Sequence, residues 1–311
     1  MSTGNKFQNA IYLLNIKTYY LNAMKVLILG SKGNLGTQLV KIFQEKKHQT
    51  TGWDKDDLDI LDQEKAGQAI KELTPDIIIN AIAYNAVDKC EEDEDQFTLA
   101  KKLNIEVPTF LAKICLDLKA VLIHYSSDYV FAGNDPKGYD EKAKTAPLNR
   151  YGFTKAEGEK EIARMALQGL KWYLIRTSKL FGPQGSSPAA KPSFFDLMLD
   201  LAKKNDRLKA VNEEKSCFTY TPDLAKATGE LIETDRSYGI YHITNTEPAT
   251  WYEACQALFE IAGIEKDLSP VSSSTFPRPA ERPKHSQLLN TKLPPLRSFK
   301  QALKDHIEKE A

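Results

Sequence analysis

The chain has 311 residues, and its 42 Lys and Arg residues balance its 42 Asp and Glu residues, so the formal net charge is zero. This length suits one large domain, or a nucleotide-binding domain with a smaller lobe. A protein that binds nucleic acid through its phosphates normally carries a basic excess, so we expect no nucleic-acid partner.

Residues 1–23 precede the first strand-like run and are predicted to be an N-terminal extension. The apolar stretch 11–21 is interrupted by Asn15, Lys17 and Thr18, which makes it too short and too polar for a membrane span or a signal peptide. No later segment reads as a membrane span, so we expect a cytoplasmic protein. The four cysteines lack CxxC spacing and a nearby His pair, which predicts free thiols and no metal site.

Apolar runs of strand length alternate with amphipathic stretches through the first half of the chain. The expected strands are 25–30, 50–54, 76–82, 121–126 and 171–177. Helix-like apolar stripes lie at 35–46 and 97–118. Near-continuous apolar runs are typical of strands buried on both faces of a parallel sheet. The alternation predicts an α/β fold of the Rossmann type, with a doubly wound parallel sheet.

The texture of the sequence changes after residue 178. We predict a dinucleotide-binding Rossmann domain over 24–178 and a smaller, mainly substrate-binding lobe over 179–311. The features expected in the second part are a Gly-, Pro- and Ser-rich loop at 182–192, a helix at 194–204, a strand near 239–244 that can rejoin the main sheet, and a Pro- and Ser-rich stretch at 270–283.

Three glycines follow the first strand in the run GSKGNLG: Gly30, Gly33 and Gly36. Glycine permits a tight turn and close approach of the backbone to a phosphate, and the helix that follows offers free N–H groups and a positive dipole end. The GxxGxxG spacing is one residue off the commonest dinucleotide fingerprint, and a structural turn is the alternative. Its position between a strand and a helix favours a pyrophosphate site.

Asp54 ends the second expected strand, where a carboxylate can bind the ribose hydroxyls of NAD. Lys55 follows at once and can instead meet the 2′-phosphate of NADP. A solvated acidic loop is the third reading, since Asp56, Asp57 and Asp59 surround this point. The choice between NADH and NADPH therefore stays open.

Tyr151 and Lys155 have YxxxK spacing, which places both side chains on one helix face. An ammonium about 4 Å away stabilises a phenolate by roughly 4 kcal/mol at an effective dielectric constant of about 20, so we expect Lys155 to lower the pKa of Tyr151. Ser126 and Ser127 follow the run VLIHY at 121–125, at the strand end that faces the ligand crevice, where a hydroxyl can polarise a carbonyl. A surface helix and a turn-capping Ser are the alternatives for each taken alone.

Taken together, these segments resemble the extended short-chain dehydrogenase/reductase superfamily, and within it the dTDP-4-dehydrorhamnose reductase family. The runs INAIAYNAVDKCE, SSDYVF and YGFTKAEGE carry the resemblance beyond the glycines and YxxxK. It implies reduction of the 4-keto group of a nucleotide-linked deoxysugar, with dTDP-4-dehydro-L-rhamnose as the expected substrate. Tyr129 stands where related dehydratases carry Glu, which argues against removal of water.

The resemblance also implies roles for individual residues. The catalytic set is Ser127, Tyr151 and Lys155. The cofactor would contact Tyr151 and Lys155 together with Gly30, Gly33, Asn34, Leu35, Gly36, Asp54, Asp59, Ile60, Ala81, Ala83, Tyr84 and Asn85. The substrate would contact Val87, Ser127, Asp128, Tyr129, Lys179 and Arg282.

Several residues depart from the pattern of the family. Lys179 stands where the reductases usually have a Trp that packs on the sugar, and the loop at 182–192 is longer than usual. Ser216 and Phe218 replace a Gly and a Pro, and Leu289 replaces an Asp or Asn. Gln38 stands where some members have a Glu linked to a divalent ion, which again predicts no metal.

Two other functions remain open. One is a non-catalytic NADP-binding protein similar to the regulatory subunit of methionine adenosyltransferase, with which the altered Lys179 region is compatible. The other is a reductase or epimerase of another nucleotide sugar. The sequence leaves the oligomeric state open, with a homodimer as one option.

Overall fold

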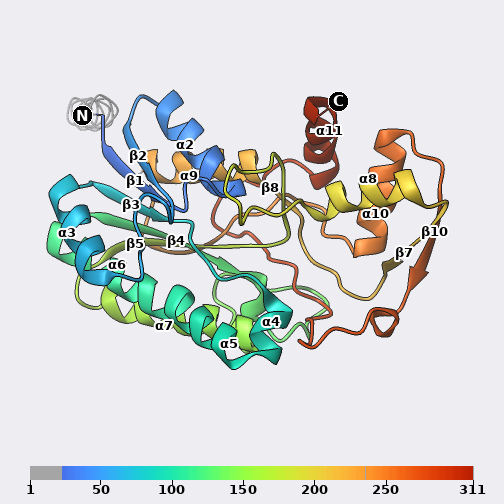
Figure 1. Cartoon of the computed structure of the whole chain (residues 1–311), viewed down its shortest axis with the longest axis horizontal. Coiled ribbons are helices and arrows are strands. Elements are labelled where there is room, and N and C mark those ends of the chain that lie inside the picture. Colours follow the sequence, from blue (N-terminus) through green and yellow to red (C-terminus); the bar gives the residue numbers. More distant parts are fainter. Residues whose placement is uncertain (1–22, 235, 311) are drawn as a thin grey trace, which may run out of the picture.

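A parallel sheet lies at the centre of the computed structural model, which describes residues 23–234 and 236–310 (Figure 1). The predicted N-terminal extension, apart from residue 23, lies outside them. The six strands run in the order β2-β1-β3-β4-β5-β9, and every neighbouring pair is parallel. Their bounds are β1 Lys25–Leu29, β2 Gln49–Trp53, β3 Ile77–Asn80, β4 Val121–Ser127, β5 Lys171–Thr177 and β9 Gly239–His242.

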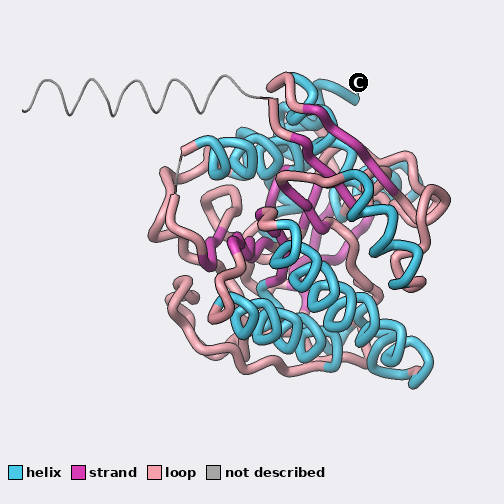
Figure 2. Tube along the Cα trace, turned by 90° about the vertical axis from the view of Figure 1, so that its left-hand side faces the viewer, coloured by secondary structure: helices cyan, strands magenta, loops and turns pink. Residues whose placement is uncertain are grey.

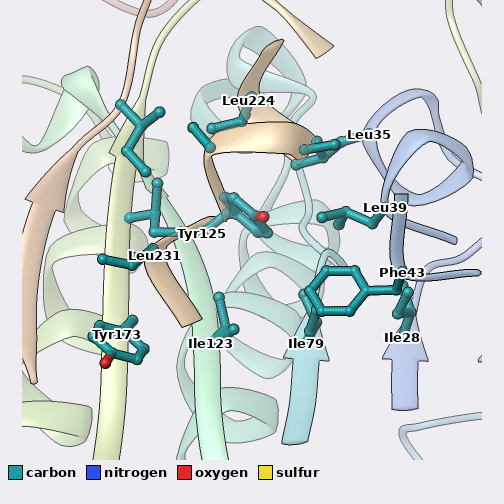
Figure 3. Close-up of a cluster of buried hydrophobic side chains, with 14 of the residues drawn as sticks. Ile28, Leu35, Leu39, Phe43, Ile79, Ile123, Tyr125, Tyr173, Leu224 and Leu231 are labelled. Atoms are coloured by element: carbon teal, nitrogen blue, oxygen red, sulfur yellow. The ribbon is translucent and has the colours of Figure 1, made fainter. Parts of the chain in front are cut away.

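Helices cover both faces of this sheet, and Figure 2 shows the strands lying between them. On one face, α2 (Asn34–Glu45) and α9 (Thr221–Glu233) bury Leu39, Phe43 and Leu224 against the strands (Figure 3). The opposite face is covered by α3 (Gln63–Leu73), α6 (Val107–Leu118) and α7 (Arg150–Ala166). The predicted doubly wound Rossmann-type fold is confirmed.

The chain reverses its direction of winding between β1 and β3. From β1 it passes to β2 on one side, and then returns to place β3 on the other side of β1. In open α/β sheets, ligands bind outside the carboxyl ends of the strands at such a point. The glycine-rich loop after β1 and the residues after β3 lie at that edge.

The second part of the chain contributes to both lobes. β9 pairs with β5, as expected for a strand near 239–244, and α9 packs on α2. Segments that follow residue 178 in the chain therefore pack in the Rossmann domain as well as in the smaller lobe. The smaller lobe has its own apolar core and contains α8 (Phe194–Lys204), β7 (Arg207–Val211), α10 (Trp251–Ala262), β10 (Asp267–Val271) and α11 (Phe299–Glu310). Short strands β6 (Leu180–Phe181) and β8 (Thr219–Tyr220) pair with each other near its border.

One predicted helix is interrupted. In place of a continuous helix at 97–118, α5 (Glu94–Lys101) and α6 are joined by a π-helical turn, Lys102–Glu106. α5 is preceded by the short α4 (Val87–Glu92). Such turns insert one residue into a helix and often mark functional sites. Asn104, whose tertiary contacts are described below, lies within this turn.

No helix in the described part of the chain is long and apolar enough to cross a membrane. All four cysteines are buried and free.

Candidate active site

The glycine-rich loop has the geometry that a phosphate site requires. Gly30 has a φ of +76°, which favours glycine, and α2 begins at Asn34 directly after Gly33. A Cβ at Gly36 would lie 2.0 Å from the Gly30 carbonyl oxygen, so only glycine fits there. No side chain caps the first turn of α2, which leaves its N–H groups available to an anion.

Asp54 lies beside this loop. Its Oδ2 accepts a hydrogen bond from the backbone N–H of Lys32 at 3.1 Å, and its Oδ1 accepts one from the N–H of Lys55 at 2.8 Å. The Lys32 ammonium, which the sequence analysis passed over, lies 3.5 Å from Asp56 and 3.6 Å from Asp57. Asp54 therefore lies against the backbone of the glycine-rich loop, and the Lys32 ammonium faces the acidic residues that follow β2.

The residues after β3 lie beside the glycine-rich loop. The Ala81 N–H donates to Leu29 O at 3.0 Å, and its backbone lies within 3.2 Å of a Cβ built at Gly30. Tyr84 follows, with its backbone N–H and C=O both bonded to the side chain of Asn104. The cofactor-binding residues predicted on these two loops, Ala83 and Asn85 included, thus follow neighbouring strand ends. Ile60 is buried in the core near this edge, and Asp59 is exposed.

Asn104 is a site residue that the sequence analysis missed. It is fully buried in the π-helical turn, and its Nδ2 also donates to Thr154 Oγ1 at 2.9 Å. Its side chain therefore ties the loop after β3 to α7, the helix that carries Tyr151 and Lys155. An Asn in an otherwise apolar helical stripe was the only available signal.

The three predicted catalytic residues come together at the carboxyl end of β4. Ser127 is the last residue of β4, and Tyr151 and Lys155 lie in the first two turns of α7. All three are buried, with Tyr151 8% and Lys155 2% exposed. The Lys155 Nζ donates to Tyr125 O at 2.6 Å, and the Tyr151 ring packs edge-on against Tyr129 at a centroid distance of 5.6 Å.

The expected lowering of the pKa of Tyr151 by Lys155 is wrong for this structure. Burial raises the pKa of the Tyr151 phenol to about 12, although a hydrogen bond with Ser127 acts in the opposite direction. Burial also lowers the pKa of Lys155 to about 8. The sequence-based argument treated burial only as a limit on the effect of the charge, whereas burial is the largest influence on the pKa of both groups. The phenol therefore carries its proton at neutral pH.

Asp128 connects the catalytic strand end to the smaller lobe. Its Oδ1 accepts a hydrogen bond from Ser127 Oγ at 3.1 Å, and its Oδ2 accepts bonds from Ser216 Oγ at 2.9 Å and Ser286 Oγ at 2.6 Å. The carboxylate is 2% exposed. Ser216 is one of the residues that depart from the family pattern, so this chain has a link between its lobes that a Gly at that position lacks.

Lys179 lies in an aromatic corner of the smaller lobe. Its Nζ is 3.8 Å from the centroid of the Trp251 ring and 4.9 Å from that of Phe218, and it donates to Glu214 O at 3.4 Å. Burial lowers the pKa of Lys179 to about 8, against the opposing charges of Asp128 and Glu214. The family usually has an apolar Trp side chain at this position. Here the position holds an ammonium that packs on the rings of Trp251 and Phe218.

Arg282 is already paired in this structure. Its guanidinium forms two hydrogen bonds to the Asp88 carboxylate, from Nη1 to Oδ1 at 2.5 Å and from Nη2 to Oδ2 at 2.7 Å. Its charge also acts on Tyr129. Val87 begins α4 beside Asp88. Val87 and Tyr129 both pack against the apolar cluster that contains Tyr151, and Arg282 is positioned by an acidic partner that the sequence analysis did not name.

The loop at 182–192 packs on the glycine-rich loop, a contact that the sequence did not reveal. The Gly185 N–H donates to Asn34 Oδ1 at 2.9 Å, and the Ser187 N–H donates to Lys32 O at 2.9 Å. Asn34 Nδ2 donates in turn to Lys191 O at 2.9 Å. The inserted loop therefore covers the edge where the pyrophosphate is expected.

Comparison with known proteins agrees with this arrangement. Residues 24–311 match the family described as RmlD substrate binding domain. The chain is 32% identical over 287 residues to the dTDP-4-dehydrorhamnose reductase of Streptomyces griseus, covering 89% of this chain and 91% of that protein. It belongs to the dTDP-4-dehydrorhamnose reductase family. That is a family of nicotinamide-dependent oxidoreductases within the extended short-chain dehydrogenases, and the predicted enzyme class is confirmed at this level.

Solved structures show the same fold. A dTDP-4-dehydrorhamnose reductase from Clostridium acetobutylicum is 33% identical, with a TM-score of 0.84 over 92% of this chain and 99% of that chain. The Bacillus anthracis reductase, solved in complex with NADP, is 30% identical, with a TM-score of 0.85 over 93% of this chain and 100% of that chain. The UDP-glucose 4-epimerase of Thermus thermophilus, at 20% identity, shares the fold alone, with a TM-score of 0.75.

Among residues 23–234 and 236–310, no group of His, Cys, Asp and Glu side chains has the arrangement of a metal site.

Proposed function

We propose that this protein reduces the keto group of a nucleotide-linked sugar with NADPH or NADH, and that the 4-keto group of dTDP-4-dehydro-L-rhamnose is its substrate. One observation carries the proposal: a buried phenol, a hydroxyl and a buried ammonium converge at the end of β4, beside a glycine-rich loop that fits a dinucleotide. The similarity of the chain to dTDP-4-dehydrorhamnose reductases supports a nucleotide-linked sugar as the class of substrate.

The residues present fit the cofactor. Gly30, Gly33 and Gly36, with the first N–H groups of α2 at Asn34 and Leu35, would hold the pyrophosphate. Asp54 would bind the adenosine ribose, and Asp59 with Ile60 would flank the adenine. The loop after β3 and the Tyr151–Lys155 pair would line the nicotinamide half. A bound reduced nicotinamide supplies the hydride for the reaction.

The chain's own residues then handle the proton. Tyr151 carries its proton at neutral pH, so its hydroxyl can donate to the sugar oxygen as negative charge develops there. Ser127 can hydrogen-bond the same oxygen, which requires its hydroxyl to turn away from Asp128. The Lys155 ammonium stabilises the phenolate that remains. Val87, Asp128, Tyr129, Lys179 and Arg282 would bind the rest of the substrate.

A direct assay tests the proposal. Purified protein is mixed with NADPH or NADH and dTDP-4-dehydro-L-rhamnose, and the loss of cofactor absorbance is followed. We expect turnover that depends on both components. Cofactor binding without turnover of any nucleotide keto-sugar would reject the proposal that the protein is an enzyme. It would favour a non-catalytic protein similar to the regulatory subunit of methionine adenosyltransferase. Turnover of a different nucleotide sugar would support the proposed reaction class but show that the proposed substrate is wrong.

The buried free cysteines fit a reducing compartment, and we propose the cytoplasm.

A further inference from the structure

Helix α7 carries a third buried polar residue behind the Tyr151–Lys155 pair. Glu159 follows Lys155 by four residues, so both lie on the same helix face. Glu159 is only 5% exposed. A carboxylate and an ammonium at this depth each need compensation inside the protein, because water cannot supply it.

Arg176, near the end of β5, compensates Glu159. Its Nε donates to Oε1 at 2.9 Å and its Nη2 donates to Oε2 at 2.6 Å, so one guanidinium engages both carboxylate oxygens. The guanidinium also lies over the Phe131 ring, 5.0 Å from its centroid, and its Nη1 is 3.4 Å from His242 Nε2. This bidentate, stacked arrangement fixes the position of the carboxylate.

Lys155 therefore lies near a carboxylate to which it is not bonded. Its Nζ donates to the carbonyl oxygen of Tyr125, and the Glu159 charge acts on it without a direct contact in the described structure. The other titratable groups facing Lys155 are Tyr151 on its own helix and His124 on β4. Burial and the Lys155 charge lower the pKa of His124 well below its usual value, so His124 is neutral.

We propose that Glu159 and Arg176 form a positioning pair for Lys155. Arg176 holds the Glu159 carboxylate in a bidentate pair, so the Lys155 ammonium stays bonded to the Tyr125 carbonyl oxygen and not to Glu159, while the Glu159 charge favours the protonated amine. Neither residue touches the substrate in this scheme. The effect on turnover rests on the proposed function, whereas the effect on the charge of Lys155 does not.

The test follows the titration of Lys155 in cofactor-free protein. The protein is labelled with carbon-13 lysine for NMR spectroscopy. The Lys155 signal is identified by its loss in Lys155→Met, and the chemical shift of this signal is recorded against pH. In Glu159→Gln we expect the titration midpoint to fall by about 1 unit, because an opposite charge is removed. In Arg176→Met we expect it to rise, because the freed carboxylate turns toward Lys155. The alkaline limb of kcat/KM should move in the same directions.

Two further variants keep the result decisive. Glu161→Gln removes a partly exposed carboxylate from the same helix, already paired with Arg164, and should leave the midpoint unchanged. The double variant Glu159→Gln/Arg176→Met leaves no buried unpaired charge, so it should fold even where a single variant does not, with a midpoint below that of the wild type. A midpoint that stays at the wild-type value in both the double variant and Arg176→Met overturns the proposal. A shifted midpoint without turnover of any keto-sugar rejects the proposed function alone.

Discussion

Asp128 accepts a 2.6 Å hydrogen bond from Ser286, a residue 158 positions further along the chain. The same carboxylate oxygen accepts a bond from Ser216. The strand end that carries Ser127 is thereby joined to two separate segments of the smaller lobe. This buried carboxylate is one of several links between the catalytic residues and the smaller lobe, together with the Arg282–Asp88 pair and the contact of Gly185 with Asn34.

Replacing Asp128 by Asn should weaken this link. One acceptor oxygen becomes an NH₂ group that cannot accept from Ser216 and Ser286, so we expect the free energy of unfolding to fall by roughly 1–3 kcal/mol. The KM for the nucleotide sugar should rise, because the lobe is held less firmly. Chemical denaturation and steady-state kinetics measure both effects. Asp117→Asn, which removes one partner of an exposed ion pair, serves as the control and should change stability little; equal effects in both variants would argue against the link.

Tyr151→Phe should remove the proton donor and leave the fold intact. We expect kcat to fall by a factor of about 10² to 10⁴, the usual contribution of a positioned acid. The dissociation constant of the cofactor, measured by fluorescence, should remain within about twofold, since a single hydroxyl is lost outside the phosphate site. Tyr252→Phe, on an exposed part of α10, should behave as the wild type. Substantial activity in Tyr151→Phe would show that another group supplies the proton.

Lys155→Met should raise stability at neutral pH while it removes activity. Burial lowers the pKa of Lys155 from its usual 10.5 to about 8, which corresponds to roughly 3 kcal/mol at most. Between these values the unfolded chain binds more protons, so wild-type stability rises with pH. The stability gain of the variant should therefore be present below pH 8 and disappear as the pH approaches 10.5.

Urea unfolding at several pH values checks this expectation, with Lys160→Met on the exposed side of α7 as the control. A variant less stable than the wild type at pH 7 would mean that the hydrogen bond to Tyr125 outweighs the cost of burying the charge.

Gly185→Ala should detach the loop at 182–192 from the glycine-rich loop. A Cβ there would lie 2.3 Å from Lys32 O and 2.5 Å from the Gly33 carbonyl carbon, so the backbone must move. Overpacking of this kind costs about 1–3 kcal/mol, which corresponds to hydrogen exchange in the loop that is faster by a factor of roughly 5 to 150. Mass spectrometry of exchange in peptides covering 183–193 measures this. Ser186→Ala is the matched control, and equal exchange in the two variants would contradict the contact.

Lys179 should make substrate binding depend on pH. Its ammonium loses its proton near pH 8, so the KM of the wild type for the nucleotide sugar should change through this range. Lys179→Met has no such charge, and its KM should stay flat there. Its kcat/KM for a 6-deoxy keto-sugar should rise by about tenfold, the usual worth of an apolar contact in a pocket. Lys204→Met, exposed on α8, should keep the wild-type profile. Parallel KM curves for the wild type and Lys179→Met would exclude Lys179 from the substrate site.

Local pattern was sufficient to predict the strands and helices of the Rossmann domain and the order of its motifs. Burial on both faces makes parallel strands read as continuous apolar runs, and GSKGNLG and YxxxK are contiguous, so both were visible in the chain. The start of α7 depends on neighbours within a few residues, because the Asn149 side chain caps its first turn.

Only the tertiary structure decided the protonation and the partners of the site residues. The pKa of Tyr151 rises where the spacing with Lys155 predicted a fall, because the balance between desolvation and charge depends on how deeply both groups are buried. Asp128, Asn104 and Arg176 bond to residues from 17 to 158 positions away. Such contacts form when separate segments pack together, and periodicity along one segment carries no information about them.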